Sequence, residues 1–475
     1  MTSQLAAAPL IALSAGAIIA LLVEAFKPGV KKSLAAWVSL LSLGTALAFL
    51  VSSWNRDYEY FGGTLRLDSV SIVLAGIVLA LGALIVLIGL KPGRPLEATR
   101  GAFHPLLLLA IAGILVMTST QDLLVVFIGL ELLSVSCYAL AGLATSDPKS
   151  NEAAVKYFLL GSFASAFLIF GLAFLYGTGG GTAIPSLLSA GRVGTEIAAL
   201  VGWAFFVVGL GFKIALVPFH GWAPDVYEGS PTPVAAFLSV GPKAAGLAVL
   251  IRVGLAAAPD VSPGAALSPL LAGLAVLTML FGNLAALRQT NLKRLLAYSS
   301  IAHSGYLLLA VLARSWTSLL FYLAAYLFMN VGAFATLLAV RRRDTGGESA
   351  ELDDLAGIGL RYPWIGACLA ACLLSLAGFP PTAGFLAKFF VFSAAVREGW
   401  IWLVVAAAAA TLVSVFYYLR IIVVMYMAEP KRDTVLDPEN PALYFVLFLC
   451  GLAVFVLGLF PGNILPLIRR AAGGL

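Results

Sequence analysis

Five ionisable side chains stand inside long apolar stretches of the sequence, where a charge is costly to keep. They are Glu131, Lys213, Lys243, His303 and Lys388. A charged side chain at the centre of a bilayer costs about 2.5–3.5 kcal/mol on insertion scales, so the carboxylate and the three lysines together cost on the order of 10 kcal/mol before any pairing. Residues kept at that cost are typical of ion pathways. The pattern therefore predicts a relay of buried acid–base groups.

Three of these residues are expected at the same depth. Glu131, Lys243 and His303 each stand about ten residues into their apolar stretch. With a rise of about 1.5 Å per residue this is about 15 Å, half of a ~30 Å hydrocarbon core. The sequence therefore predicts that three different helices place an ionisable group near the membrane midplane.

Two interpretations of the buried charges stay open on the residues alone. Glu131 and Lys213 could form a static ion pair that holds two helices together, but such a pair leaves Lys243 and Lys388 unexplained. A buried carboxylate and several lysines can instead exchange a proton when one charge moves or becomes hydrated. The second interpretation accounts for all four residues.

His303 and two residues near helix ends are further candidates. His303 has serine and tyrosine hydroxyls on both sides in the segment YSSIAHSGY, and histidine changes charge near neutral pH; the alternative is a core histidine with satisfied hydrogen bonds. Lys156 and His220 lie near the predicted cytoplasmic ends of their spans and are candidates for the entrance to the relay. For Lys156 the alternative is an interfacial lysine that extends its ammonium group to water.

Two apolar stretches contain helix breaks. One reads FKIALVPFHG at residues 212–221 and includes Pro218, and the other reads GFPPTAGFLAK at residues 378–388 and includes Pro380 and Pro381. Proline removes a backbone hydrogen bond from a helix. In lipid the freed carbonyls need partners from protein or water. Corresponding breaks in two halves of a membrane protein indicate a transport site.

The spacing of the charges suggests two related halves. Glu131 and Lys213 are 82 residues apart, and His303 and Lys388 are 85 apart. In each pair an ionisable residue is followed, two spans later, by a lysine beside a break. The lysine precedes the break in the first half and follows it in the second. This reversed order is what an inverted repeat would produce.

The composition excludes a water-soluble fold. Of the 475 residues, 61% are hydrophobic and 11% are charged, against about half and about a quarter in soluble domains. A spanning helix needs about 20 apolar residues. We therefore predict an all-α polytopic membrane protein with about 14 transmembrane helices in a single membrane domain, residues 1–475. The fourteen stretches lie near residues 5–26, 33–52, 69–90, 104–119, 121–144, 153–176, 197–219, 232–257, 266–287, 293–312, 316–340, 362–396, 400–428 and 441–461.

The loop charges predict the orientation. With the N-terminus outside, seventeen basic residues fall on one side of the membrane and eight on the other. The basic-rich side should be cytoplasmic, and an even number of spans then places both termini on the outer side. The seventeen are Lys27, Lys31, Lys32, Lys91, Arg94, Arg100, Lys149, Lys156, Arg288, Lys293, Arg294, Arg341, Arg342, Arg343, Arg361, Lys431 and Arg432. The eight are Arg56, Arg66, Arg192, Arg252, Arg314, Arg397, Arg469 and Arg470. Such dispersed cations do not form the dense patch of a nucleic-acid-binding protein, so no nucleic-acid partner is expected.

The cysteines and the first apolar stretch have ordinary explanations. Cys137, Cys368, Cys372 and Cys450 all lie in apolar stretches without a CxxC spacing, so we interpret them as buried small hydrophobic residues and expect no metal. The stretch at residues 5–26 has no basic residue before it and no clear cleavage site. It is predicted to be a retained first span rather than a signal peptide.

Three motifs resemble one known family. They are VPFHGWAPDVYEGSPTPV at residues 217–234, GLELLS at residues 129–134 and GFPPTAGF at residues 378–385. Together they are similar to the antiporter-like membrane subunits of respiratory complex I, the proton-translocating NADH–quinone oxidoreductase, and within that family to the subunit N group. The resemblance spans nearly the whole chain.

The resemblance implies a fold and a role for each buried charge. It implies fourteen helices with two inverted five-helix repeats, whose broken helices are the seventh and the twelfth. Glu131 and Lys213 would be the ion pair of an input half-channel, Lys243 the central link and Lys388 the output lysine, and Lys156 also matches a functional family position. The corresponding division of the chain is 1–103 for the first three spans, 104–257 for the first repeat, 266–428 for the second repeat and 441–475 for the last span and tail.

The resemblance also implies which chemistry this chain leaves to its partners. FMN, iron–sulfur clusters and quinone would belong to other subunits, with no redox cofactor bound here, and the neighbours in a bacterial-type inner membrane would include sister antiporter-like subunits. The sequence itself shows no dinucleotide fingerprint and no cluster of cysteines. The alternative is a subunit of a multisubunit cation/proton antiporter. Sodium coordination would favour additional buried carboxylates, whereas lysines dominate here.

Overall fold

Apolar helices make up most of the chain in the computed structural model, which describes residues 6–26, 33–90, 101–184, 196–256, 263–343, 348, 350–430, 432–437 and 440–473. Some of the loop cations that predict the orientation lie outside these described residues, namely Lys27, Lys31, Lys32, Lys91, Arg94, Arg100, Arg192 and Lys431. The first half contains α1 (Ala8–Phe26), α2 (Ser33–Ser52), β1 (Tyr58–Tyr60), β2 (Leu65–Leu67), α3 (Ser69–Gly89), α4 (Phe103–Ser119), α5 (Leu123–Ala141), α6 (Pro148–Gly179), α8 (Glu196–Lys213), α9 (Ala223–Gly229) and α10 (Thr232–Ala256).

The second half has the same character. It contains α11 (Pro263–Ala286), α12 (Leu292–Leu312), α13 (Trp316–Ala339), β3 (Val340–Arg342), η3 (Leu352–Leu355), α14 (Ile358–Arg361), α15 (Pro363–Ala377), α16 (Ala383–Arg397), α17 (Ile401–Met427), β4 (Thr434–Leu436), α18 (Pro441–Leu459), η4 (Pro461–Asn463) and α19 (Leu465–Ala472).

The predicted spans are found where apolar length places them. Among the described residues, eleven helices are long and apolar enough to cross a membrane, and the shorter apolar helices α4, α8 and α15 bring the number to fourteen. Each of the fourteen predicted stretches overlaps one of these helices. The stretches at 197–219 and 362–396 are the two that the structure divides, because α8 ends at Lys213 and α15 ends at Ala377.

Polar side chains fix where several spans begin. The Asp122 carboxylate accepts hydrogen bonds from the backbone amides of Leu124 and Val125 at the start of α5, and the Asn291 side chain accepts from the amide of Arg294 at the start of α12. Such caps satisfy backbone N–H groups that have no partner within the helix. They set the register in which α5 and α12 present their buried charges.

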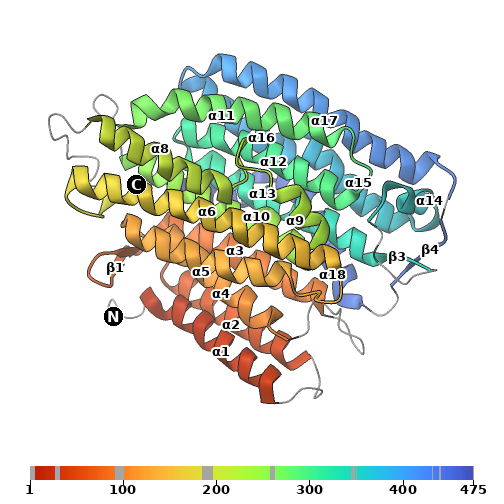
Figure 1. Ribbon diagram of the computed structural model, residues 1–475. Coiled ribbons are helices and arrows are strands. Elements are labelled where there is room, and N and C mark those ends of the chain that lie inside the picture. Colours follow the sequence, from red (N-terminus) through yellow and green to blue (C-terminus); the bar gives the residue numbers. More distant parts are fainter. Residues whose placement is uncertain are drawn as a thin grey trace.

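The helices form a bundle whose most buried members are α10, α12 and α13. Figure 1 shows α1 and α2 at one edge of the bundle and α11 and α17 at the opposite edge. α10 packs against both α12 and α13 near the middle, and nearly every residue in the apolar parts of these three helices is buried. A charge on these helices is therefore screened from lipid by protein on all sides.

Two sets of five spans share one packing pattern. In the first set α4 packs against α5 and α10, and α5 packs against α6; in the second set α11 packs against α12 and α17, and α12 packs against α13. In each set the fourth span is the broken one. Because consecutive spans alternate in direction, an offset of five spans reverses every helix. The two sets are therefore inverted repeats, as the order of lysine and break suggests.

The two ends of the bundle carry different short sheets. The antiparallel hairpin β1–β2 pairs Tyr58 with Leu67. Ala6, the first described residue, shares a small cavity with Tyr60 of this hairpin, and Ala472, near the last described residue, shares a larger cavity with its Arg66. Both ends of the described chain therefore lie at the hairpin end of the bundle, as an even number of spans requires.

The opposite end is tied together by charged loops. The β3–β4 pair lies there (Figure 1), and the buried Asp354 carboxylate accepts hydrogen bonds from Arg342 at 2.9 and 2.8 Å and from Arg432 at 2.7 Å. Burial acts to raise the pKa of Asp354, but the hydrogen bonds from the two arginines outweigh it and hold this pKa below its ordinary value. Asp354 is therefore ionised at neutral pH and joins the loop after α13 to the loop after α17.

Candidate functional site

The first ionisable pair lies on α5 and at the end of α8. Glu131 is near the middle of the nineteen-residue α5, and it accepts a hydrogen bond from the Ser165 hydroxyl of α6. Lys213 is buried and donates to the Ser134 hydroxyl of α5 at 2.9 Å. The two charged groups therefore bind separate serines. The direct ion pair expected for them, static or in a half-channel, is not formed in this structure.

Aromatic rings take the place of a counter-ion for Lys213. Its ammonium nitrogen lies 5.7 Å from the ring centroid of Tyr138 and 5.6 Å from that of Tyr157. A ring face attracts a cation within about 6 Å. The lysine is thus stabilised without a bound carboxylate, and its proton is not held by an ion pair.

The first helix break is held by hydrogen bonds from two side chains, one directly after the break and one on α12. It contains Pro218, and its freed carbonyls receive donors: the Trp222 indole donates to the Phe212 carbonyl at 2.9 Å, and the Ser304 hydroxyl donates to the Ile214 carbonyl at 2.6 Å. These partners come from protein, as an interrupted helix at membrane depth requires. The break is therefore an ordered feature that ties α8 to α12.

Lys243 occupies the centre of the bundle. It lies near the middle of the twenty-five-residue α10 and donates to the Ser304 hydroxyl at 2.8 Å and to the Ser300 carbonyl. Since Ser304 also donates to the carbonyl of Ile214, one hydroxyl connects the first break to the central lysine.

His303 lies in a cage of tyrosines one residue away from that serine. Its Nδ1 is 2.7 Å from the Tyr322 hydroxyl and its Nε2 is 3.4 Å from the Tyr418 hydroxyl. The rings of Tyr326 and Tyr306 lie 4.9 and 5.7 Å from the imidazole, centroid to centroid. Both ring nitrogens thus have a hydroxyl partner that can give or take a proton. The same two contacts also satisfy the hydrogen bonding of the imidazole within the core.

Lys388, on α16, is the last of the five buried ionisable residues, which together form a row through the bundle. It donates to the carbonyls of Leu376 and Ala377 at 3.0 Å each, which are among the carbonyls left without helical partners where α15 ends. Its ammonium nitrogen also lies 4.9 Å from the centroid of the Tyr306 ring. Because the same ring packs against the imidazole of His303, Tyr306 lies between the histidine and the last lysine.

The second break depends on close backbone approach. It contains Pro380 and Pro381, and Gly378 adopts a φ of +91° at the end of α15, a conformation that favours glycine. The Gly384 amide donates to the Ser375 hydroxyl at 2.9 Å. A Cβ at position 384 would overlap the Ser375 carbonyl oxygen. This contact sets the path of the chain from α15 into α16.

The two candidates for the entrance lie at the edge of the relay. The Lys156 ammonium pairs with Glu152 at 2.6 Å and with Asp225 of α9 at 2.7 Å, and its side chain is 43% exposed. His220 is half-buried in the first break, and its ring centroid lies 4.6 Å from that of Phe281. Among the described residues neither bonds directly to the buried lysines, so an entrance role for either requires water between them.

One cation that the loop pattern assigns to the outer side is buried within a helix instead of lying in a loop. The loop pattern places Arg252 with the outer cations, but it lies inside α10 and pairs with Asp68 at 2.9 Å, with both side chains almost fully buried. It also donates to the Ser71 hydroxyl at 2.7 Å and to the Thr118 carbonyl at 3.0 Å. The pair joins the end of α10 to the start of α3. The sequence does carry a signal for the burial of Arg252, because residue 252 falls within the apolar stretch 232–257.

Sequence reasoning missed the residues that bridge the charges. Ser134 and Ser165 hold the first pair, and Tyr322 and Tyr418 hold the histidine. The sequence carries a partial signal for the first of these, because Ser134 follows the glutamate by three residues and so lies on the same helix face. The other three come from different helices, and nothing in the local sequence indicates them.

The arrangement suits proton exchange between neighbours. His303 lies within electrostatic range of both Lys243 and Lys388. Like charges in a buried region oppose one another, so a proton gained by one of the three favours release from another. Hydroxyls placed between such groups can pass a proton by accepting on one side and donating on the other.

The fold and the site together define a class of protein. It is the class of many-span helical membrane proteins that carry a row of buried acid–base groups between two broken helices. The chain belongs to the family described as NADH:quinone oxidoreductase/Mrp antiporter, TM, which matches residues 120–414. All five ionisable residues of the row lie within the matched region.

Curated relatives and solved structures agree with this family. The chain is 41% identical to NADH-quinone oxidoreductase subunit N 2 of Roseiflexus castenholzii, over 96% of this chain and 94% of the relative. It is similar to a chain of respiratory complex I from Thermus thermophilus with bound aureothin, with 35% identity, a TM-score of 0.83, and coverage of 96% of this chain and 98% of that one. A chain of the Mrp complex from Dietzia sp. DQ12-45-1b has a TM-score of 0.82 at 22% identity, with coverage of 100% and 98%, and this likeness concerns the fold.

Proposed function

We propose that this chain is the proton-translocating membrane subunit N of an NADH–quinone oxidoreductase in a bacterial-type inner membrane, with both termini on the outer side. Electron transfer from NADH to quinone takes place in other subunits, which carry FMN and the iron–sulfur clusters. The neighbours in the membrane include sister antiporter-like subunits. The relationship to a curated subunit N over nearly the full length of both chains supports this assignment.

The proposed relay runs along the membrane plane. It starts at Glu131 and Lys213, passes Lys243 and His303, and ends at Lys388. The observation that carries it is that α12 supplies consecutive contacts to both repeats: Ser304 reaches the first break and the central lysine, and the histidine and tyrosine beside it reach toward the last lysine. The two breaks at its ends are the places where water can reach the row from opposite sides.

The division of the chain supports the same function. Residues 104–257 hold the first three groups of the relay and residues 266–428 hold the last two, so each proposed repeat contributes one half. The described helices of the segments 1–103 and 441–475 pack on the repeats from outside, with α1 against α4 and α18 against α13. We infer that these outer spans position the repeats and carry no proton.

A proton-pumping assay on substituted complexes tests the relay. Lys213→Ala and Glu131→Ala are each expected to lower both quinone reductase activity and proton pumping in membranes that contain the assembled complex. Arg288→Ala is the matched control, because it also removes a charge but the side chain is exposed. Normal pumping per electron in both relay variants, with assembly intact, would contradict the proposal.

A subunit of a multisubunit cation/proton antiporter is the second candidate, and the similarity in fold to the Mrp complex chain favours it. The two functions differ in their partners. Purification of the native complex with flavin and iron–sulfur subunits supports the oxidoreductase. Purification in a complex without redox centres, together with sodium-dependent proton flux, supports the antiporter.

A further inference from the structure

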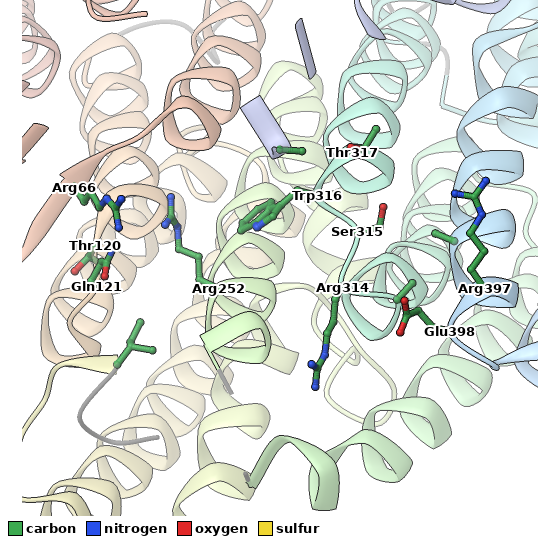
Figure 2. A pocket seen from close by; sticks show the side chains of 14 residues that line it. Arg66, Thr120, Gln121, Arg252, Arg314, Ser315, Trp316, Thr317, Arg397 and Glu398 are labelled. Carbon is green, nitrogen blue, oxygen red and sulfur yellow. The ribbon is translucent and has the colours of Figure 1, made fainter. Parts of the chain in front are cut away.

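A cavity of about 610 Å³ lies at the hairpin end of the bundle, away from the relay. Its walls come from β2, the α4–α5 connection, the last turns of α10 and α16, the α12–α13 connection and α19. Four arginines line it, and Glu398 is the one carboxylate among the described lining residues. Figure 2 shows these side chains spread around the cavity, with Arg66 and Arg252 on one side and Arg397 on the other. The arginines are Arg66, Arg252, Arg314 and Arg397.

It is informative that the four cations lining this cavity are all arginines and none is a lysine. All eight basic residues assigned to the outer side are arginines, whereas the seventeen on the other side include eight lysines. Half of the eight line this one cavity. Topology disfavours cations on the outer side, so their concentration around one cavity requires another cause. Arginine differs from lysine in its planar fork of donors, which matches phosphate and carboxylate groups.

One wall of the cavity is organised by carboxylates behind it. The Arg66 guanidinium donates to Asp57, with one contact at 2.9 Å, and Arg252 pairs with Asp68. Asp68 also acts electrostatically on Arg66, so the four charges form one alternating network. Within the described residues, each guanidinium keeps one terminal nitrogen without a hydrogen bond, so donors remain available on a rigid wall.

The other wall carries two cations whose side chains have no partner among the residues that the structure describes. The side chains of Arg314 and Arg397 form no hydrogen bond or ion pair with another described residue, and the same holds for the side chains of Gln121 and Thr317, which also line the cavity. Arg314 is half-buried and Arg397 is exposed. This wall can therefore supply two guanidinium forks and a hydroxyl to a ligand without breaking an existing contact, and the Gln121 amide is available on the side of Arg66 (Figure 2).

We propose that this cavity binds a phosphate-bearing anion, supplied by the headgroup of an anionic phospholipid or by free phosphate. The volume is within the ordinary range for a small-ligand site. Guanidinium–phosphate contacts are charge-assisted and often bidentate, and the position at the ends of the spans is the level of the lipid headgroups. The proposal does not depend on the proton relay, because no residue of the relay lines the cavity.

Lipid retention by the full-length chain tests the first source. The double variant Arg314→Gln/Arg397→Gln removes the unpaired charges and leaves the buried pair of Arg252 intact. Arg56→Gln is the matched control, because Arg56 is also an outer arginine but bonds to Tyr58 outside the cavity. In native mass spectrometry, wild type and control are expected to retain phosphatidylglycerol in preference to phosphatidylcholine, and the double variant to lose this preference.

A thermal-shift titration with inorganic phosphate tests the second source. If free phosphate is the ligand, it raises the Tm of the delipidated wild type and control at constant ionic strength. Removing the charge-assisted hydrogen bond that one arginine donates to phosphate weakens binding by about tenfold, so the double variant should bind phosphate at least about 100-fold more weakly. Circular dichroism verifies that the variant is folded. The proposal is overturned if neither probe binds the wild type, or if the folded double variant binds either probe as well as the control does.

Discussion

Replacing Ser304 by alanine removes one hydroxyl that joins the two halves of the relay. Ser304 accepts from the Lys243 ammonium at 2.8 Å and donates to the carbonyl of Ile214 at 2.6 Å, and it is fully buried. A hydrogen bond to a charged group contributes about 1.5–3 kcal/mol, which corresponds to about 10- to 150-fold in a rate or an equilibrium. Because the lysine keeps its bond to the Ser300 carbonyl, we expect the lower end, about a tenfold slower relay.

The assay is the initial rate of proton pumping driven by NADH in membrane vesicles that contain the assembled complex. Quinone reductase activity should fall with pumping, because the two are coupled in the proposed function. Ser239→Ala is the matched control: it is also a fully buried serine, on α10, but it bonds to the Ala236 carbonyl within its own helix and should leave pumping unchanged. Wild-type pumping in the assembled Ser304→Ala complex would refute the role of the Ser304 hydroxyl in connecting the two halves of the relay.

Three further predictions follow from other contacts. Tyr322→Phe removes the 2.7 Å hydrogen bond to the histidine and should slow pumping several-fold, whereas Tyr326→Phe keeps the ring that packs on the imidazole and should have a smaller effect; equal effects would contradict the hydroxyl's role. Gly384→Ala forces a Cβ into a backbone carbonyl, while Gly273→Ala adds a Cβ with no atom within 4 Å, so in membrane blots the first should abolish accumulation of the assembled complex and the second should not. Asp354→Asn removes the charge shared by two arginines, and limited proteolysis should cut the loop after α13 faster in this variant at pH 7. Since the pKa of this carboxyl is lowered in the fold, its stabilisation is present above the ordinary pKa and is lost as the pH falls through the lowered value. The difference in cleavage should therefore vanish in strong acid, and a difference that persists there would contradict the assignment.

The spans could be predicted because the bilayer sets a length that apolar sequence must match. The stretch at 293–312, for example, agrees with α12 to within one residue at its start. The ends of helices that continue into polar sequence could be predicted less closely. For example, α6 begins at Pro148, five residues before its predicted start, because the helix continues beyond the apolar part. The strands β3 and β4 are three residues each and pair across a long sequence separation, so they leave no periodic signal.

The buried charges could be predicted from their cost, but their partners could not. An ionisable residue in an apolar stretch is visible in one sequence, and Glu131, Lys243 and His303 all lie near mid-helix as expected. Which group it bonds to depends on how helices pack. The expected direct contact of Glu131 with Lys213 is replaced by two serines, one of them on α6. For Arg252 the location itself could not be predicted, because a charge near the end of an apolar stretch can lie either in the loop or inside the helix.

The most direct test of the relay is the number of protons pumped per electron when its centre is removed. Lys243→Met keeps much of the side-chain volume on α10 and removes the ammonium group that donates to the Ser304 hydroxyl, which in turn bonds to the first break. We predict that the assembled variant loses most of its NADH-driven proton pumping and that its quinone reductase activity falls as well. An assembled Lys243→Met complex that pumps the wild-type number of protons per electron at the wild-type rate would contradict the relay.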